Sequence, residues 1–430
     1  MSSSSFQPQS RASHASGASK RSVDVLILGA GLAGTSLALH LGREGFSGTI
    51  ALVDARRDFS GEARWCCWGE IPAPLDEAVT HRWSSWRVGN GFGDGARQAL
   101  QHCQSQPYSE IHAPAFFARF HARLASSAGV SLVLGQSAGG WSESGGRVQI
   151  STGEGAARTD WDAGRVFDAR GLEMARLRRL TDSTARGREI AWTQKFVGQI
   201  LRFDTPTFDP ETVTLMDFDV PQSARGVRFA YVLPFSDRHA LVEMTAFSPV
   251  AVDESELVGV LNGYAARLGR NAQIEGWERG EIPMNTRALR PLIGERSMAI
   301  GAVGGAIRAA TGYGFGRTQA QTQSIARALV RGENPSSPLL TPRSRLQSAK
   351  FGALDTIFLR ALDTGPDFAR DCFLRLFEQV SPPALTRFLG ETSTMRDEVA
   401  LIGALPKLAF LGAAARSFSH GALPQRKQGR

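Results

Sequence analysis

Hydrophobic and polar positions near the start of the chain change from one periodicity to another, and their order predicts a fold. Residues 24–28 form a run of β-branched and aliphatic side chains, and residues 35–45 have the apolar spacing of a helix. Residues 49–53 form a second apolar run. A glycine-rich turn joins the first run to the helix. The order predicts a compact βαβ unit with parallel strands.

Farther along the chain the pattern changes twice more. Residues 116–124 predict a helix, and residues 195–247 are rich in strand-forming runs separated by Pro and Gly, as is typical of an antiparallel sheet. A further helix is predicted over 254–268, and past Pro335 only helical periodicity follows. We therefore expect an α/β fold in which a Rossmann-like domain is joined by an antiparallel-sheet substrate domain and a helical C-terminal cap.

Composition places the chain among globular proteins. Its 430 residues are 42% hydrophobic and 21% charged, which allows two or three structural modules. The net charge of +8, from 49 basic and 41 acidic side chains, suits an acidic membrane surface or a phosphate-bearing ligand, and an Arg-rich proteome explains it equally well. No basic run is interleaved with aromatic residues, so nucleic acid is not an expected partner.

Targeting and redox signals point to a reducing compartment and peripheral membrane contact. Cys66 and Cys67 are adjacent among only four cysteines, which argues against a disulfide framework. Residues 1–22 lack the apolar segment of a secretory signal and are expected to be a disordered tail. The longest apolar stretch, 399–415, is interrupted by a Pro-Lys pair and is too short and broken to span a bilayer.

The turn after the first strand carries a dinucleotide-binding motif. Gly29 permits the tight turn, Gly31 lets backbone N–H groups approach a pyrophosphate, and Gly34 allows the helix to pack closely on the strand. The helix N-terminus adds a partial positive charge. Asp54 ends the second strand, where its carboxylate can accept hydrogen bonds from ribose hydroxyls. Strand, turn, helix and acid together predict a dinucleotide site rather than a chance glycine turn.

A second glycine-rich element far downstream favours FAD over NAD. Gly304, Gly305, Thr311 and Gly312 lie in a segment that is expected to return beside the flavin, with a loop used only for packing as the alternative. The resulting domain boundaries are 1–22 for the tail, 23–175 with 278–330 for a discontinuous FAD-binding domain, 176–277 for the substrate-binding sheet domain, and 331–430 for the helical region.

Five short motifs, in this order and spacing, resemble those of bacterial and plant-type lycopene cyclases: Arg64–Trp68 (RWCCW), Phe229–Pro234 (FAYVLP), Leu241–Thr245 (LVEMT), Ile282–Met284 (IPM) and Thr311–Tyr313 (TGY). The C-terminal segments Phe373–Phe377, Arg387–Leu389 and Pro406–Leu411 are similar to the helical end of the same family. The resemblance extends from Val23 to about Ala414.

The resemblance implies an enzyme of carotenoid biosynthesis that closes β-ionone-type rings on the ends of lycopene. It implies reduced FAD, with NAD(P)H as electron donor, and no net redox change in the substrate. It also implies a cytoplasmic protein peripherally associated with the inner face of the membrane. Two positions depart from the family: Ile200 stands where some bacterial cyclases carry a glutamate, and Cys67 stands where relatives often have Phe. The first departure prevents transfer of a mechanism that depends on that glutamate.

Ring closure by this chemistry needs a proton donor, a dry cavity and a base. Glu243 lies in an alternating strand on the same face as Leu241 and Thr245, and it matches the family's Glu-x-Thr motif, which favours a catalytic role over an exposed ion pair. Asp217 also matches a family position, and a substrate-side role and a structural hydrogen bond are equally open there. Asp168 closes a strand, and we expect it to stabilise a turn.

Several alternatives remain at this stage. Trp65, Trp68, Tyr231 and Tyr313 could face a cation or simply pack in the core. The histidines show no ligand spacing, so no metal is expected. An FAD-dependent oxidoreductase of the hydroxylase or prenyl-reductase type shares the N-terminal motif, and a carotenoid-carrying flavoprotein is a third reading. The ring type, β, γ or ε, and the number of ends cyclised stay open.

Overall fold

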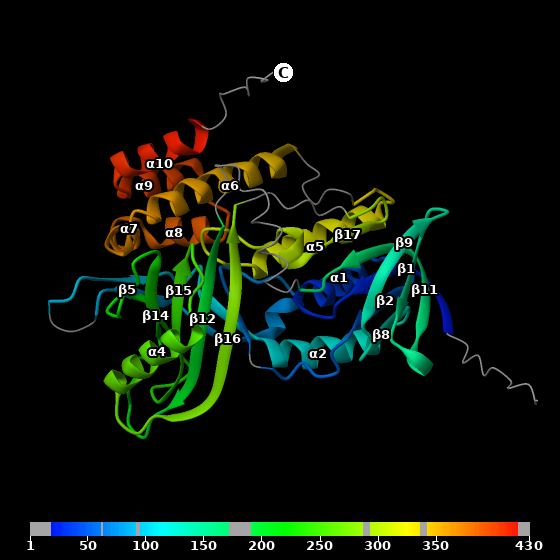
Figure 1. The fold of residues 1–430 in the computed structure, drawn as a ribbon, viewed down its shortest axis with the longest axis horizontal. Helices are drawn as coiled ribbons and strands as arrows, with labels where there is room; N and C mark the ends of the chain where they lie inside the picture. Colours follow the sequence, from blue (N-terminus) through cyan, green and yellow to red (C-terminus); the bar gives the residue numbers. More distant parts are fainter. Residues whose placement is uncertain are drawn as a thin grey trace, which may run out of the picture.

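The protein, described by a computed structural model over residues 19–61, 63–91, 95–171, 191–286, 293–335 and 342–419, is built on two large sheets. The sheets lie side by side in Figure 1, and a layer of C-terminal helices lies above one of them. Each large sheet has seven strands, and a third sheet of three strands accompanies them. The mixed α/β class expected from the sequence is confirmed.

The first sheet contains the predicted βαβ unit, with strand order β8-β2-β1-β11-β10-β9 and β17 pairing with β11. β1 runs parallel to both β2 and β11, as a βαβ unit requires. The side chains of β2 are buried throughout, which explains its uninterrupted apolar run. The elements are β1 (Ser19–Leu28), α1 (Leu32–Arg43), β2 (Ile50–Asp54), α2 (Ala113–Ala125), β8 (Val130–Leu134), β9 (Ala138–Ser144), β10 (Arg147–Thr152), η2 (Gly155–Ala157), β11 (Thr159–Asp168), β17 (Ser297–Ala299), η3 (Gly301–Gly304) and α5 (Phe315–Val330).

β1 begins earlier than the sequence indicated. Residues 19–22, expected to belong to the tail, pair in register with Thr159–Asp162 of β11, while residues 1–18 lie outside the described part. Their side chains are polar and exposed, so no hydrophobic pattern marks them as a strand. Pairing of the backbone with β11, rather than a hydrophobic pattern, extends β1 at its start.

The second sheet is mostly antiparallel, with strand order β16-β12-β15-β14-β13-β5-β6. α4 (Glu254–Leu268) packs on it and has the bounds predicted from the sequence. The strands are β5 (Ser85–Gly89), β6 (Gln98–His102), β12 (Ala191–Arg202), β13 (Thr212–Asp217), β14 (Val227–Pro234), β15 (His239–Ser248) and β16 (Gln273–Asn285).

This sheet takes strands from outside the predicted substrate segment, 176–277. β5 pairs in parallel with β13, and β6 follows at the edge, although both lie within 23–175. β16 runs across the expected boundary at 277. Pairing between strands more than 100 residues apart leaves no trace in local periodicity, which is why the sequence assigned them otherwise.

The three-stranded sheet, in the order β3-β7-β4, contributes side chains to the cores of both large ones: Ile111 packs in the core of the first and Tyr108 in that of the second. Trp68, on β3, packs in a common core with Trp83 and Trp86, and the last of these is fully buried. Trp83 and Trp86 therefore serve core packing. The elements are β3 (Arg64–Trp68), η1 (Leu75–Ala78), β4 (Val79–Trp83) and β7 (Tyr108–His112).

The C-terminal helices form the layer above the second sheet in Figure 1. Phe373 and its neighbours on the second of these helices pack against Phe218 beside β13. Within the described residues no single helix is long and apolar enough to cross a membrane. The last two helices pass that test together, over Met395–Ala404 and Lys407–Ser417, but they bend by 113° at their junction. The helices are α6 (Pro342–Leu362), α7 (Pro366–Gln379), α8 (Pro382–Leu389), α9 (Met395–Ala404) and α10 (Lys407–Ser419).

Candidate active site

A cavity of about 1020 Å³ lies where the glycine-rich turns beside the first sheet, the second sheet and the helical layer meet. Its walls come from the turn before α1, the loops at 169–171 and 300–314, strands β12, β14 and β15, and helices of the C-terminal layer. Most of the lining side chains are aliphatic or aromatic. The space suits a long apolar ligand at one end and a cofactor at the other.

The turn between β1 and α1 has the geometry that the glycine motif predicts. Gly29 has a φ of +101°, which side-chain-bearing residues rarely adopt. A Cβ on Gly34 would lie 1.9 Å from the carbonyl oxygen of Gly29, so only glycine allows the helix to pack this closely. Gly31 lines the cavity, and a Cβ there would approach only Arg56, at 3.5 Å. The protein itself thus leaves the space at Gly31 open.

α1 presents its N-terminus to this open space. Its N-cap, Gly31, makes no side-chain hydrogen bond, and Leu32 and Ala33 of the first turn line the cavity. Free N–H groups and the helix dipole form a site for an anion such as a pyrophosphate. The guanidinium of Arg56 lines the same end of the cavity.

Asp54 lies beneath the turn at the end of β2 and is 7% exposed. Its Oδ2 accepts a hydrogen bond from the Ala30 N–H at 2.7 Å, and its carboxylate pairs with Arg56, with 2.9 Å between Nη2 and Oδ2. Burial alone would raise the pKa of Asp54, but the hydrogen bonds from Arg56 outweigh burial and lower it. Asp54 is therefore ionised, ties the turn to β2 and orients Arg56.

The downstream glycine-rich loop lies against the start of α1. Gly301 has a φ of +71°, and a Cβ there would lie 2.7 Å from that of Ala33. Of the four predicted positions, Thr311 and Gly312 line the cavity. The other two lie behind the wall: the carbonyl of Gly304 accepts a hydrogen bond from Gln321, and Gly305 ends η3 in a left-handed conformation.

Gly301 belongs to the glycine run that predicted this loop, and it lines the cavity, although Gly304 and Gly305 were the positions singled out from the sequence. The run therefore predicted the loop but not which of its glycines borders the cavity.

Glu243 lies on β15, lines the cavity and is 6% exposed. The hydroxyl of Thr245 donates a hydrogen bond to its Oε1. Burial raises the pKa of Glu243 to about 8, with a further contribution from the negative charge of Glu278, while the hydroxyl of Thr245 acts against both. The carboxyl group thus holds its proton at neutral pH and can act as an acid.

A buried charge network, not anticipated from the sequence, stands beside Glu243. The backbone N–H and Nη1 of Arg64 donate to Glu278, at 2.9 Å and 3.0 Å. Nε of the same arginine lies 2.9 Å from Oε1 of Glu110, whose Oε2 is 2.8 Å from Nδ1 of His81. Burial raises the pKa of Glu278 and Arg64 opposes this, whereas hydrogen bonds and Arg64 hold the pKa of Glu110 low despite its burial.

The register of the second sheet explains how two carboxyl groups come together. Gly198 on β12 pairs with Glu243 on one side and with Glu278 on the other. Because glycine has no side chain, nothing on β12 separates them. Two residues along the same strand, Ile200 pairs with Leu241 and is 8% exposed within the apolar core. The position that carries glutamate in some relatives is thus filled here by core packing.

Three tyrosines line the cavity near Glu243. The hydroxyl of Tyr108 lies 3.0 Å from that of Tyr231 and 3.2 Å from that of Tyr313, and Tyr231 donates to the Cys66 sulfur at 3.3 Å. Burial raises the pKa of all three, that of Tyr313 to about 12, so the ring faces stay uncharged. Trp65 and Trp68 also line the cavity.

Asp217, the second catalytic candidate, does not line the cavity. Its Oδ1 accepts hydrogen bonds from the backbone N–H groups of Gly91 and Asp219, at 2.9 Å and 3.0 Å, and its Oδ2 accepts one from the Tyr264 hydroxyl at 2.9 Å. These three bonds support the structural alternative. Asp168 binds the backbone and guanidinium of Arg170, which is the turn-stabilising role expected for it.

No group of three or more metal-ligating side chains occurs in the parts of the chain that the structure describes. The site therefore consists of an anion-binding turn, a carboxyl acid with a raised pKa, and an aromatic wall. This arrangement can hold a dinucleotide and deliver a proton to an apolar ligand.

Known proteins resemble the chain in sequence and in fold. A curated lycopene beta-cyclase from Paracoccus sp. (strain N81106 / MBIC 01143) is 28% identical over 276 residues, which are 61% of this chain and 61% of that protein, so the match covers less than two thirds of the relative. A geranylgeranyl bacteriochlorophyll reductase-like protein from Thermoplasma acidophilum superposes with a TM-score of 0.62 at 16% identity, covering 93% of this chain and 97% of that one. A flavoprotein/dehydrogenase from Cytophaga hutchinsonii gives 0.60 at 13% identity, covering 93% and 100%.

The two solved structures establish the fold at these identities, and the sequence match establishes the family. Residues 24–415 match the family described as lycopene cyclase protein, a range that includes the glycine turn, the cavity and nearly all of the helical layer. On this match across most of its length, the chain belongs to the lycopene cyclase family.

Proposed function

We propose that the protein is a lycopene cyclase of carotenoid biosynthesis that closes β-ionone-type rings by acid–base chemistry. The observation that carries the proposal is Glu243, a buried carboxyl group with a pKa raised to about 8 in an apolar cavity. Cyclisation needs such an acid, because a terminal alkene is protonated only by a donor in a dry site.

The residues at the dinucleotide end fit FAD. The uncapped start of α1, the open space at Gly31 and the guanidinium of Arg56 suit the pyrophosphate. Gly301 and the Thr311–Gly312 pair would border the part of the cofactor nearest the substrate. Reduced FAD, with electrons from NAD(P)H, would supply an electron-rich ring that stabilises positive charge.

The protein's own groups supply the proton steps. Glu243 gives its proton to the terminal double bond, and the neighbouring double bond closes the ring on the resulting cation. A ring proton then leaves to the Glu243 carboxylate, so the substrate gains and loses one proton. The ring faces of Tyr231 and Tyr313 attract the cation, and the apolar wall keeps out water that would trap it.

A peripheral position on the inner face of the cytoplasmic membrane belongs to the same proposal. Lycopene is a hydrocarbon held in lipid, and a protein with a net charge of +8 is attracted to anionic lipid. Nucleic acid has no part in this function.

The test is to incubate purified FAD-loaded protein with lycopene and NAD(P)H in D₂O and to identify the pigments by chromatography and mass spectrometry. We expect cyclic carotenoid with one solvent deuterium in each new ring, and NAD(P)H use that is far below one per ring. NAD(P)H consumed in proportion to product would mean net reduction, and an FAD-dependent oxidoreductase acting on an isoprenoid would replace the cyclase. Recovery of unchanged lycopene would favour the third alternative, a flavoprotein that only carries carotenoid.

A further inference from the structure

The last two helices expose apolar side chains that soluble proteins ordinarily bury. Among the described residues, ten large hydrophobic side chains are strongly exposed, and five of them lie on α9 and α10. Those five are Met395, Val399, Ile402, Leu408 and Leu411, with exposed fractions of 56% to 88%. The spacing 395, 399, 402 places three on one face of α9. We call these five residues the apolar face.

The apolar face is also the rim of the cavity. Val399, Ile402 and Leu411 are exposed to solvent and at the same time line the cavity that reaches Glu243. Gly403 and Ala414 line it beside them with little or no side chain. The cavity therefore opens between α9 and α10, and most of the side chains at its opening are apolar.

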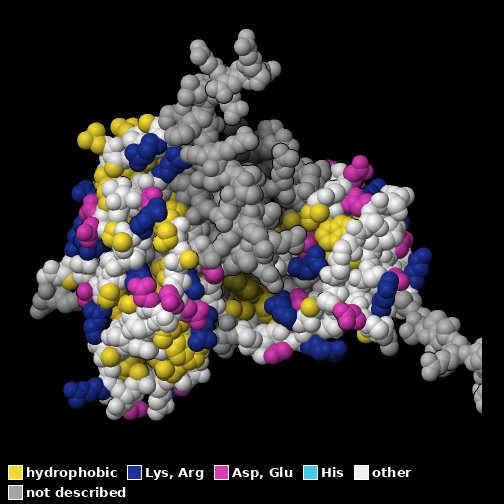
Figure 2. All heavy atoms as spheres, in the orientation of Figure 1, with side chains coloured by type: hydrophobic (Ala, Val, Ile, Leu, Met, Phe, Trp, Pro, Cys, Tyr) yellow, Lys and Arg dark blue, Asp and Glu magenta, His cyan; other side chains and the backbone are white. Residues whose placement is uncertain are grey.

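The exposed charges on α9 and α10 are all positive. Arg396, Lys407 and Arg416 are exposed on the two helices. The two acids of α9 are buried instead: Asp397 pairs with Arg387, and Glu398 pairs with Lys350. Figure 2 shows hydrophobic and basic side chains side by side at the corner of the molecule that α9 and α10 occupy.

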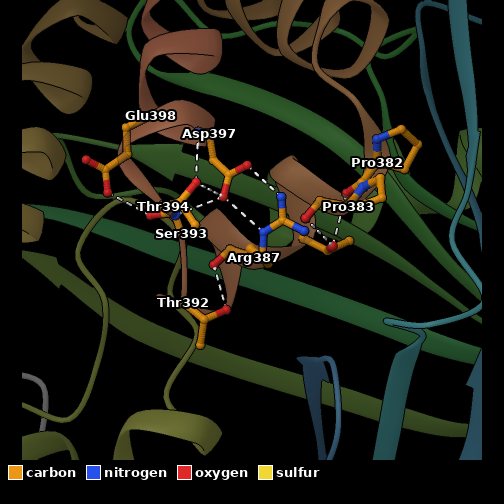
Figure 3. A network of polar contacts seen from close by, with 9 residues as sticks. Pro382, Pro383, Arg387, Thr392, Ser393, Thr394, Asp397 and Glu398 are labelled. Carbon is orange, nitrogen blue, oxygen red and sulfur yellow. Dashed lines mark hydrogen bonds and ion pairs between the residues drawn. The ribbon is translucent and has the colours of Figure 1, made fainter.

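The buried side of α9 is fixed firmly enough to hold the apolar face outward. Thr394 caps the helix in a reciprocal pair with Asp397, and Nε and Nη2 of Arg387 donate hydrogen bonds to that carboxylate, at 2.9 Å and 2.6 Å. Figure 3 shows Arg387 and Asp397 pointing toward each other, with Ser393 bonded to Glu398 beside them. The exposure of Val399 and Ile402 is thus built into the anchored helix.

The geometry points to the apolar face of α9 and α10 as the surface that docks on an anionic lipid bilayer and admits the carotenoid directly from the membrane into the cavity. This inference rests on the proposed function for the identity of the substrate. Apolar side chains ringed by Lys and Arg are the composition of surfaces that lie in the bilayer interface. The bend of 113° between the helices lets both place their apolar sides in one layer without a spanning segment.

The observations favour a bilayer over a second copy of the chain. Two copies meeting through this surface would bring Arg396, Lys407 and Arg416 of each against their equivalents, with no exposed acid on either helix to pair with them. They would also close the opening of the cavity. Anionic headgroups match the charges and leave the opening facing the hydrocarbon that holds the substrate.

The test uses the double variant Met395→Ser with Leu408→Ser. Both residues are exposed, and neither lines the cavity. The matched control is Val250→Ser with Ile274→Ser, two residues exposed to 48% and 50% outside the C-terminal helices. Each FAD-loaded protein is floated with vesicles containing phosphatidylglycerol, and cyclisation is measured with lycopene in those vesicles and, separately, in detergent micelles.

We expect the double variant to bind the vesicles at least tenfold more weakly than wild type, to lose vesicle activity in proportion and to keep its activity in detergent. The control should match wild type in all three measurements. The inference would be overturned if the double variant bound vesicles as tightly as wild type. It would also be overturned if the wild type were a dimer that the double substitution converted to a monomer without changing lipid binding. Absence of cyclisation even in detergent would count against the proposed function while flotation still decides the docking surface.

Discussion

Glu243 and Glu278 flank Gly198 on adjacent strands and both line the cavity, with no side chain of β12 between them. Glu278 is bonded to Arg64, whereas Glu243 is bonded only to the Thr245 hydroxyl among the contacts that the structure gives it. The two carboxyl groups therefore differ: Glu278 is paired with the positive charge of Arg64, and Glu243 keeps its proton. The predictions below follow from this difference and from the geometry of the neighbouring elements.

Glu243→Gln should keep the fold and the FAD, because the amide has nearly the shape of the acid, and should lower the cyclisation rate by about 10²–10⁴-fold, because an amide is a poor proton donor. The rate is measured by pigment chromatography at saturating lycopene. Glu211→Gln, in an exposed turn, is the matched control and should behave as wild type. A Glu243→Gln rate within about threefold of wild type, well short of the acid–base range, would remove Glu243 from the mechanism.

The pH dependence of the cyclisation rate should also report the ionisation of Glu243. Since the pKa of Glu243 is raised to about 8, the rate should fall as pH rises through about 8, by about tenfold per unit above it. In Glu278→Gln the negative charge beside Glu243 is gone, so this limb should move to lower pH by about one unit. Glu278→Asp, which restores the charge, should move it back. A limb that stays in place in Glu278→Gln would show that burial alone sets the pKa.

Stability should respond to pH with a defined sign. The folded-state pKa of Glu243, about 8, lies above its ordinary value of 4.5, so its protonated form contributes stability that is fully present below about pH 4.5 and is lost as pH rises toward 8. Glu243→Gln has no proton to lose there. The free energy of unfolding of Glu243→Gln minus that of wild type, both measured with urea, should therefore increase from pH 5 to pH 8. A difference that stays constant across this range would contradict the prediction.

Gly31→Val should abolish flavin retention, because a branched side chain would fill the open space before α1 through which the backbone reaches the pyrophosphate. Flavin absorbance of the purified protein measures this. Gly42→Val lies on the same helix with nothing within 4 Å of its Cβ, and it should retain flavin. Full FAD occupancy in Gly31→Val would show that this turn does not hold the cofactor.

Asp217→Ala should destabilise the protein without affecting catalysis directly. It removes the acceptor of three hydrogen bonds, one of them buried and two partly buried, and we expect a loss of about 2–4 kcal/mol in the free energy of unfolding. Tyr264→Phe removes one of these bonds and should cost less, about 1 kcal/mol. Asp217→Asn, which is nearly isosteric, tests the contrary case. A stable, FAD-loaded Asp217→Asn protein with a greatly reduced rate would show that Asp217 takes part in the reaction.

Local patterns in the sequence predicted what local forces determine. The turn at Gly29–Gly34, the bounds of α4 and the all-helical end follow from side-chain spacing and backbone conformation, and each was predicted. Glu243 was found because its motif resembles that of a family. Arg64 was quoted only as the start of a motif, and Glu278 was missed, because their meeting depends on the register of β12 against β16 and on the approach of β3. Long-range pairing sets both, and no periodicity records it.

The placement of β11 between β1 and β17 has a consequence for how the protein is made. β11 pairs with β1, in which Ser19 lies opposite Thr159, some 140 residues later in the chain. It also pairs with β17, which begins at Ser297. The sheet that bears the glycine turn before α1 is therefore incomplete until Ala299 has left the ribosome, while β12 to β16 are already outside. Such distant closures slow folding. A gene cut between residues 175 and 176 would leave β5 and β6 in one product and their partner β13 in the other, so neither half would carry a complete seven-stranded sheet.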